Sequence, residues 1–348
     1  MTHEFKKLIQ GYLNAQQLGL ACVTATVVAL EGSSYRRPGV RMLINEHSQM
    51  TGAVSGGCVE KEILKQSDSV FKTGRPKMIS YDGRYKLGCE GVLYILIEKF
   101  TPKPEMIEAF DQNLKARKEF EIETRFEKRH GESDNWGSRI VLSQKQFYSF
   151  SGADLAPPAI TDSTNNEKLF TQYLKPCFKL LIIGAEHDAA QLSLTASHLG
   201  WEVAVVTSPS NPAVLSDFPG ASELVKKNAE QLEIDKIDKQ MAIVLMTHSY
   251  VKDLQYLTSF MDARPAYIGL LGPSNRRERI LNDLIEKQPM VDDELFELVF
   301  GPAGINIGAE TPEEIAMSIC SEILSVVRKQ EPKSLKDKSG SIHHNIRF

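Results

Sequence analysis

The stretch that decides the fold is Phe178–Val206, FKLLIIGAEHDAAQLSLTASHLGWEVAVV. A short apolar run over Lys179–Ile183 ends at Gly184, and a second apolar run follows at Glu202–Val206. Between the two runs, apolar residues recur at helical spacing, at Leu192, Ala196 and Leu199. Strand, helix and strand in this order form a βαβ unit, so the sequence predicts a Rossmann-like parallel sheet.

Two further strand-to-loop transitions follow in the same half of the chain. The run Ala242–Met246 leads into Thr247-His248-Ser249, and Ala266–Leu271 leads into Gly272-Pro273-Ser274-Asn275-Arg276-Arg277. Open α/β sheets bind ligands at the carboxyl ends of their strands, which makes the polar residues of both loops candidate ligand contacts. Ser274 is also a plausible helix N-cap, with the two arginines in the first turn. The alternatives are a helix-capping or solvated His248 and a solvated helix face for the arginines.

The first turn of the βαβ unit gives a weak dinucleotide signal. It begins at Gly184 and contains His187, but Glu186 and Asp188 place carboxylates where a pyrophosphate would lie. The second strand ends in Thr207-Ser208-Pro209, without the acidic residue that holds a ribose. The pattern therefore predicts the fold and argues against tight NAD(P) binding.

The first half of the chain holds the densest set of chemically active residues, in EGSSYRRPGVRM and SGGCVE. Three arginines suit phosphate contacts, at Arg36, Arg37 and Arg41. Gly56 and Gly57 would let backbone amides approach a ligand, and Cys58 would begin a helix, where a thiol becomes a better nucleophile or metal ligand. Backbone amides of Ser55–Cys58 would complete an anion cradle. The residues alone leave open a second interpretation, a surface arginine cluster beside a small buried cysteine.

Composition excludes several classes of protein. The chain has 348 residues, 42% apolar residues and a net charge of −4, which are values of an ordinary globular protein rather than of a nucleic-acid binder. No apolar run is long enough to span a membrane, and the N-terminus does not resemble a signal peptide. Five scattered cysteines without a CxxC pair fit a reducing cytoplasm, and Cys22, Cys177 and Cys320 are expected in the core.

These patterns predict an α/β protein with a small N-terminal α/β domain and a C-terminal Rossmann-like domain. The expected divisions are a first domain over 1–100, a polar variable region and connection over 101–175, the Rossmann-like domain over 176–328 and a disordered tail over 329–348. Cys89 lies in a glycine-containing loop of the first domain.

The motifs resemble those of the XdhC/CoxI family, whose members mature xanthine dehydrogenase and related molybdenum hydroxylases. The resemblance rests on GSSYRRPGVRM, SGGCVE, Gly88–Gly91, GAEHDAA, MTHS, YIGLLGPSNRR and GPAGINIGAETPEEIA, in this order along both halves. It implies that the chain binds molybdenum cofactor, in a mononucleotide or dinucleotide form, supports its sulfuration and inserts it into an apo-hydroxylase. A cysteine desulfurase would supply the sulfur, and a homodimer is expected by likeness.

Combined with the residues, the resemblance implies a set of candidate cofactor-binding positions. They are Arg36, Arg37, Arg41, Ser55, Gly56, Gly57, Cys58, Glu60, Cys89, Gly184, His187, His248, Ser274, Arg276 and Arg277. Cys58 and Cys89 are the candidate metal ligands, and no catalytic residue is assigned. Two alternatives remain: an NAD(P)-dependent oxidoreductase with His248 as acid or base, and an assembly factor that docks on the hydroxylase without touching the cofactor.

Overall fold

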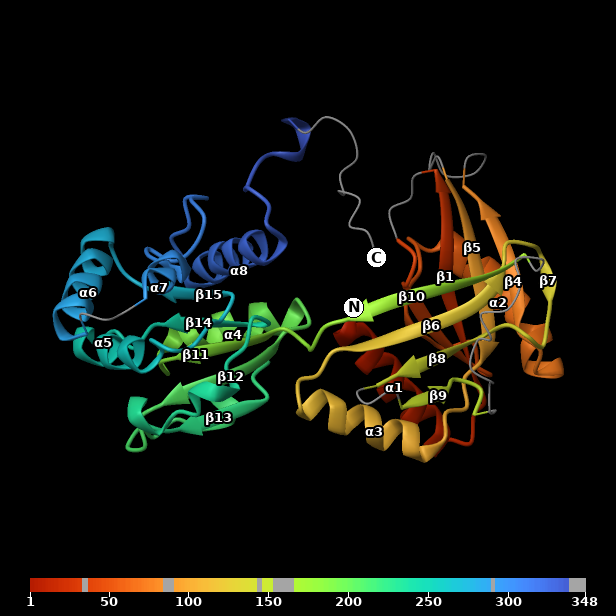
Figure 1. Ribbon diagram of the computed structural model, residues 1–348, viewed down its shortest axis with the longest axis horizontal. Coiled ribbons are helices and arrows are strands. Elements are labelled where there is room, and N and C mark those ends of the chain that lie inside the picture. The colour runs from red at the N-terminus through yellow and green to blue at the C-terminus, as the bar shows by residue number, and fades with distance from the viewer. Residues whose placement is uncertain (33–36, 84–90, 143–145, 153–165, 289–291, 338–348) are drawn as a thin grey trace. The chain divides into compact units, whose positions relative to one another are not determined.

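The structure is a computed structural model, and it describes residues 1–32, 37–83, 91–142, 146–152, 166–288 and 292–337 (Figure 1). The chain divides into two compact units, the first ending at Pro176 and the second beginning at Cys177. Each unit has its own sheets and its own apolar cores.

The first unit is built on an antiparallel sheet, sheet A. In the described residues its strand order is β3-β2-β1-β5-β4-β7. The strands are β1 (Cys22–Gly32), β2 (Arg41–Asn45), β3 (Met50–Gly52), β4 (Lys77–Asp82), β5 (Gly91–Lys99) and β7 (Gly131–Glu132). Helix α2 (Cys58–Thr73) packs on one face through Val59 and Ile63, against the alternate residues Val23, Ala25 and Val27 of β1.

A second antiparallel sheet, sheet B, lies over the other face of sheet A, and the strands of the two sheets cross in Figure 1. Its described strands run in the order β10-β6-β8-β9. They are β6 (Phe120–Glu127), β8 (Gly137–Val141), β9 (Phe147–Ser149) and β10 (Glu167–Leu174). Helices α1 (Thr2–Gln17) and α3 (Pro104–Lys115) share an aromatic core with sheet B, in which the rings of Phe5 and Phe110 meet edge to face at 5.3 Å.

A polar layer is buried between the two sheets. Glu98 of β5 is 1% exposed and accepts a hydrogen bond from the amide of Ser138 of β8 at 2.8 Å. Arg41 of β2 is 7% exposed, and its charge interacts with that of Glu98. Among the described residues, Glu98 Oε1 and the Nε and Nη2 of Arg41 have no hydrogen-bond partner. Burial raises the pKa of Glu98 to about 7, although the Ser138 hydrogen bonds and Arg41 oppose the rise.

The second unit is built on a parallel sheet, sheet C. In the described residues its order is β13-β12-β11-β14-β15-β16. The strands are β11 (Lys179–Ile183), β12 (Glu202–Thr207), β13 (Glu223–Lys226), β14 (Met241–Leu245), β15 (Tyr267–Leu270) and β16 (Val299–Phe300). Counted along the chain this order is 3-2-1-4-5-6, the order of a Rossmann fold, and its switch point lies between β11 and β14.

Helices cover both faces of sheet C, which explains why its strands are apolar runs rather than alternating ones. Leu180 and Ile182 pack towards α4 (His187–His198) and α8 (Pro312–Arg328). Leu181 and Ile183 pack towards the opposite face, with α5 (Tyr250–Ser259), α6 (Ser274–Lys287) and α7 (Asp293–Leu298). Short 3-10 turns lie at Leu215–Asp217, Ala229–Gln231, Ile234–Lys236 and Leu335–Asp337.

The structure confirms the α/β fold class with a Rossmann-like C-terminal part. Cys22, Cys177 and Cys320 are buried, as expected. Leu199 was expected on the buried helical face but is 37% exposed, because α4 ends at His198 and Leu199 is its C-cap. In the part of the chain that the structure describes, no helix combines the length and the apolar character needed to cross a membrane.

The buried carboxyl of Glu98 predicts a pH-dependent stability. The folded protein holds this proton up to about pH 7, whereas 4.5 is the ordinary pKa expected in the unfolded chain, so the free energy of unfolding falls as pH rises from about 4.5 through 7. Glu98→Gln cannot ionise. Its stability relative to wild type should therefore grow by about 1–3 kcal/mol between pH 5 and pH 8, measured by urea unfolding. Exposed Glu119→Gln is the control, and identical pH profiles for Glu98→Gln and wild type would contradict the assignment.

Candidate functional site

The loop before α2 is folded around the carboxylate of Glu60, which is 5% exposed. Its Oε1 accepts hydrogen bonds from the amides of Val54 at 3.1 Å and Ser55 at 2.6 Å. Its Oε2 accepts from the Ser55 hydroxyl at 2.5 Å and from the amide of Gly57 at 2.9 Å. Burial alone would raise the pKa of Glu60, but these hydrogen bonds outweigh it and the pKa lies below its usual value.

This arrangement differs from the expected amide cradle. The amides of Ser55 and Gly57, which we predicted would hold an anion of the ligand, already hold an anion of the chain itself. Glu60, predicted as a cofactor contact, is instead bonded within the loop.

No described residue covers the outer surface of this loop. Gly56 and Gly57 are exposed, and no described atom lies within 4 Å of a Cβ built on either glycine. Gly57 has a φ of 122°, which only glycine adopts readily, and α2 then begins at Cys58. The side chain of Cys58 and the whole of Cys89 lie outside the described residues, and the described residues contain no group of three or more His, Cys, Asp or Glu arranged to hold a metal ion.

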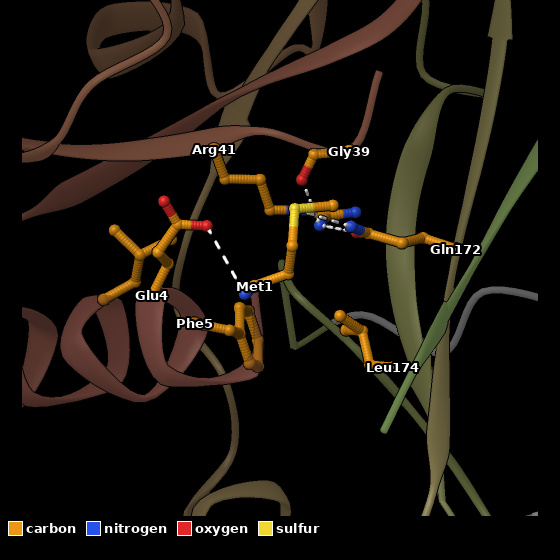
Figure 2. A pocket seen from close by; sticks show the side chains of 8 residues that line it. Met1, Glu4, Phe5, Gly39, Arg41, Gln172 and Leu174 are labelled. Carbon is orange, nitrogen blue, oxygen red and sulfur yellow. Dashed lines mark hydrogen bonds and ion pairs between the residues drawn. The ribbon is translucent and has the colours of Figure 1, made fainter. Parts of the chain in front are cut away.

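Arg41 points away from this loop. Its neighbours Val40 and Met42 face α2, so by strand alternation the Arg41 side chain lies on the other face of sheet A. There its Nη1 donates to the carbonyl oxygen of Gly39 at 2.9 Å and to Gln172 Oε1 of β10 (Figure 2). Both partners belong to the wall of a small pocket, which is lined by Met1, Glu4, Phe5, Leu8, Gly39, Arg41, Gln172 and Leu174.

The described part of the structure therefore does not show the three arginines grouped beside Cys58. Arg41 anchors the turn at Gly39, whose φ is 95° and whose amide donates to Val27 O at 2.7 Å. Arg37 is partly exposed just before that turn, and Arg36 lies outside the described residues.

In the second unit, two backbone segments touch at the switch point of sheet C. A Cβ on Gly184, at the end of β11, would lie 2.4 Å from the carbonyl oxygen of Met246, which follows β14. The contact between the two loops is by itself enough to require glycine at this position. The approach brings Asp188 of α4 close to His248, with 3.7 Å between Asp188 Oδ2 and His248 Nε2.

A buried carboxylate holds the loop that carries His248. Asp253 of α5 is 1% exposed and accepts hydrogen bonds from the amide of Thr247 at 3.2 Å and its hydroxyl at 2.6 Å. Its other oxygen pairs with Arg276 Nη2 at 2.6 Å. Arg276 is thus bonded within the protein through Nη2, while its buried Nε has no hydrogen-bond partner among the described residues.

The remaining predicted residues of this unit have simple placements. His187 is the first residue of α4 and is exposed. Ser274 is exposed and is the first helical residue of α6, not its N-cap, because Pro273 holds the cap position. Arg277 donates to the carbonyl oxygen of Val299 at 3.2 Å.

Three buried residues that organise these sites were not predicted: Gln172, Asp253 and Glu98. Asp253 carried a usable signal, since it follows the predicted Thr247-His248-Ser249 loop by a few residues and is the acid in the first turn of α5, a position that favours carboxylates. Gln172 had none, because its partner Arg41 is 131 residues away in the chain.

Two family sequence models match the chain. The model described as the XdhC Rossmann domain matches residues 180–323, and the model described as the XdhC and CoxI family matches residues 15–82. The chain belongs to the XdhC/CoxI family.

Similar proteins extend this likeness over nearly the whole chain. A Bacillus subtilis protein, named as a probable subunit of xanthine dehydrogenase, is 28% identical, over 93% of this chain and 98% of its own. The molybdenum cofactor insertion chaperone PaoD of Escherichia coli is 22% identical, over 96% of this chain and 92% of its own. A crystal structure described as a xanthine dehydrogenase from Bacillus halodurans superposes with a TM-score of 0.76 and 25% identity, covering 93% of this chain and 96% of that one.

The hydrogen bonds of Arg41 to Gly39 and Gln172 leave little room at Gly39, so a methyl group there should lower stability strongly. A Cβ there would lie 2.5 Å from Gln172 Nε2, in addition to the cost of φ 95°. Gly39→Ala should lower the free energy of unfolding by about 2 kcal/mol or more. Gly19→Ala has φ 70° with no described atom within 4 Å, so it measures the backbone cost alone. Equal losses for the two variants in urea unfolding would show that the Gln172 contact is relieved without cost.

The Glu60 loop predicts a second stability difference. Glu60→Ala leaves the buried amide of Val54 and the partly buried hydrogen bonds of Ser55 and Gly57 without their acceptor and should cost about 2–3 kcal/mol at pH 7. Because the pKa of Glu60 is lowered in the folded protein, the loss should shrink as pH falls below 4.5, the ordinary value for the unfolded chain. Glu314→Ala is the matched control: this exposed glutamate also accepts amide hydrogen bonds at the third position of a helix, α8, and its removal should cost less.

Proposed function

We propose that this chain is a maturation factor for molybdenum hydroxylases of the xanthine dehydrogenase type. It binds molybdenum cofactor as cargo, supports its sulfuration and inserts it into the apo-enzyme. The observation that carries the proposal is the match to PaoD, named a molybdenum cofactor insertion chaperone, over 96% of this chain. The Bacillus subtilis relative, whose name refers to xanthine dehydrogenase, supports the same class of client.

The described residues suit a cargo that approaches the start of α2. No described residue covers Gly56, and the backbone conformation of Gly56 does not require glycine, so its missing side chain favours a close approach from outside. The amides nearby already hold Glu60. Arg36 and Arg37 are therefore the proposed phosphate contacts, and Cys58 or Cys89 the proposed contact to molybdenum or relay for sulfur.

The partners in this proposal are the apo-hydroxylase and a cysteine desulfurase, and the working form is a homodimer. The cofactor is molybdopterin with either a phosphate or a dinucleotide tail. Both tails carry the phosphate that the arginines would bind, so the proposal covers either form.

An NAD(P)-dependent oxidoreductase is the second candidate, and the local charges count against it. The first turn of α4 carries exposed Glu186 and partly exposed Asp188 at the place where a pyrophosphate would lie. The guanidinium of Arg276, which would offset them, is already paired with Asp253. A factor that only docks on the hydroxylase is the third candidate.

Cofactor loading tests the proposal. Full-length protein is purified without oxygen from cells that make molybdenum cofactor, and molybdenum content and pterin fluorescence are measured per chain. Wild type should carry near-stoichiometric metal and pterin, whereas Cys58→Ala and Arg37→Ala should each carry several-fold less. The matched control is Arg75→Ala, because Arg75 is exposed, pairs with Asp134 at 3.0 Å and lies beyond the far end of the sixteen-residue α2.

The outcomes separate the candidates. Equal loading of wild type and Cys58→Ala would support the carrier function but assign the molybdenum contact to Cys89. Loading of Cys89→Ala would then test that assignment. Absence of cofactor from every variant, together with full maturation of the hydroxylase, would favour docking alone. Specific NAD(P) binding by the wild type would favour the oxidoreductase.

A further inference from the structure

His248 has a strained backbone. Its φ is 56°, in the left-handed region that costs residues other than glycine folding free energy. Among the described residues, Ser48, Arg117 and Lys329 also have positive φ. Those three lie in a hairpin turn or just after a helix, where left-handed residues end the element. His248 instead lies between a strand and a helix, at the switch point of the parallel sheet.

Neighbouring residues hold this conformation from both sides. The hydroxyl of Thr247 donates to Asp253 at 2.6 Å, and it also accepts from the amide of Ser249 at 3.2 Å. Ser249 is the N-cap of α5, so the residues before and after His248 are both fixed. Asp253 is fixed in turn by Arg276, whose guanidinium also lies over the ring of Tyr250 at 5.8 Å.

The strain serves no packing purpose. The His248 side chain is 50% exposed and therefore fills no part of the core. Its nearest charged group is Asp188, which the Gly184–Met246 contact brings to 3.7 Å. A histidine that costs stability and buries little is the pattern of a residue retained for contact with a ligand.

We propose that His248 is the ligand-contacting side chain of the second unit and that Thr247 and Asp253 are positioning residues that hold it in the left-handed conformation. This inference rests on the proposed function and deepens it by naming a ligand-contacting residue of the second unit and the chemical class of group that this residue contacts. Rossmann-like sheets bind ligands at the switch point, which is where His248 lies.

The surrounding charges indicate the class of ligand. Glu186 and Asp188 are acceptors at the start of α4, and the nearby guanidinium of Arg276 is paired with Asp253. Carboxylates repel a phosphate but accept hydrogen bonds from N–H groups, and an imidazole can donate to a ring carbonyl or nitrogen. A neutral heterocycle with adjacent N–H and C=O groups, such as the ring of a pterin, fits this site better than a phosphate.

The first experiment separates the stability cost of the His248 backbone conformation from the contribution of its side chain to cofactor loading. Glycine adopts the left-handed region freely, so His248→Gly should raise the melting temperature by a few degrees while lowering cofactor loading several-fold. Lys329→Gly is the matched control, since Lys329 has φ 52° at the end of α8: it should gain stability and load like wild type. Unchanged loading in His248→Gly would overturn the proposal, as would loss of stability in His248→Gly alone.

The second experiment tests the positioning residues. Thr247→Val keeps the shape but removes the hydroxyl that bonds Asp253, and it should lower loading as far as His248→Gly does. Thr247→Ser retains the hydroxyl and should restore loading. If Thr247→Val and Thr247→Ser load equally at matched melting temperatures, Thr247 does not act through His248.

Binding of simple probes tests the ligand class. In the full chain, free pterin should shift the His248 ring signals in NMR spectra, with assignments made by comparison with His248→Gly, and inorganic phosphate should leave them unchanged. Shifts with phosphate alone would reverse the assignment of the ligand class. If wild type loads no cofactor but its His248 signals still shift with pterin, the proposed function is rejected and the His248 site is retained. If wild type loads cofactor normally but its His248 signals do not respond, the proposed function is retained and the His248 site is rejected.

Discussion

The second unit depends on a contact between two backbones. Gly184 and Met246 end neighbouring parallel strands, and they lie so close that a methyl group on Gly184 would be 2.4 Å from the Met246 oxygen. This approach sets the distance between the β11–α4 turn and the β14–α5 loop, and therefore the distance between Asp188 and His248. Because the strand order changes direction between β11 and β14, the contact also lies where a Rossmann sheet opens to ligands.

The first unit depends on a different constraint, two ionisable side chains buried between two sheets. Sheet B could pack on sheet A with apolar residues alone, as it does around Phe5, but Arg41 and Glu98 introduce charges that are expensive to bury. Arg41 recovers part of this cost through Gly39 and Gln172, contacts that join β2, the turn after Arg37 and β10. Arg41 thus ties the turn after Arg37 to both sheets, which an apolar side chain at this position could not do.

Local pattern was enough to predict the Rossmann-like half. Runs such as Lys179–Ile183 are buried on both faces and bounded by glycine, so strand, helix and strand follow from hydrophobicity and spacing alone. The same reasoning failed for Phe120–Glu127 and Glu167–Leu174, in a region expected to be a polar connection. In Phe120–Glu127 charged residues alternate with apolar ones, and the two strands pair with each other across forty residues of sequence or more. The candidate site divides in the same way: residue types and loops were predicted, but the partners of Arg41 and Arg276 were not.

Those partners show why a sequence pattern typical of phosphate binding can also have an internal role, in which carboxylates of the chain itself bond the same groups. Arginines and helix-start amides attract anions whether the anion belongs to a ligand or to the chain. In this protein Glu60 takes the amides before α2, and Asp253 takes the guanidinium at α6. Each internal carboxylate occupies groups that could bind a phosphate, and each joins the ends of a loop: the one that leads into Cys58 and the one that carries His248. For the carrier function proposed above, this arrangement would be an advantage, because loops held in place orient a ligand without adding a strong charge–charge attraction that release would have to break.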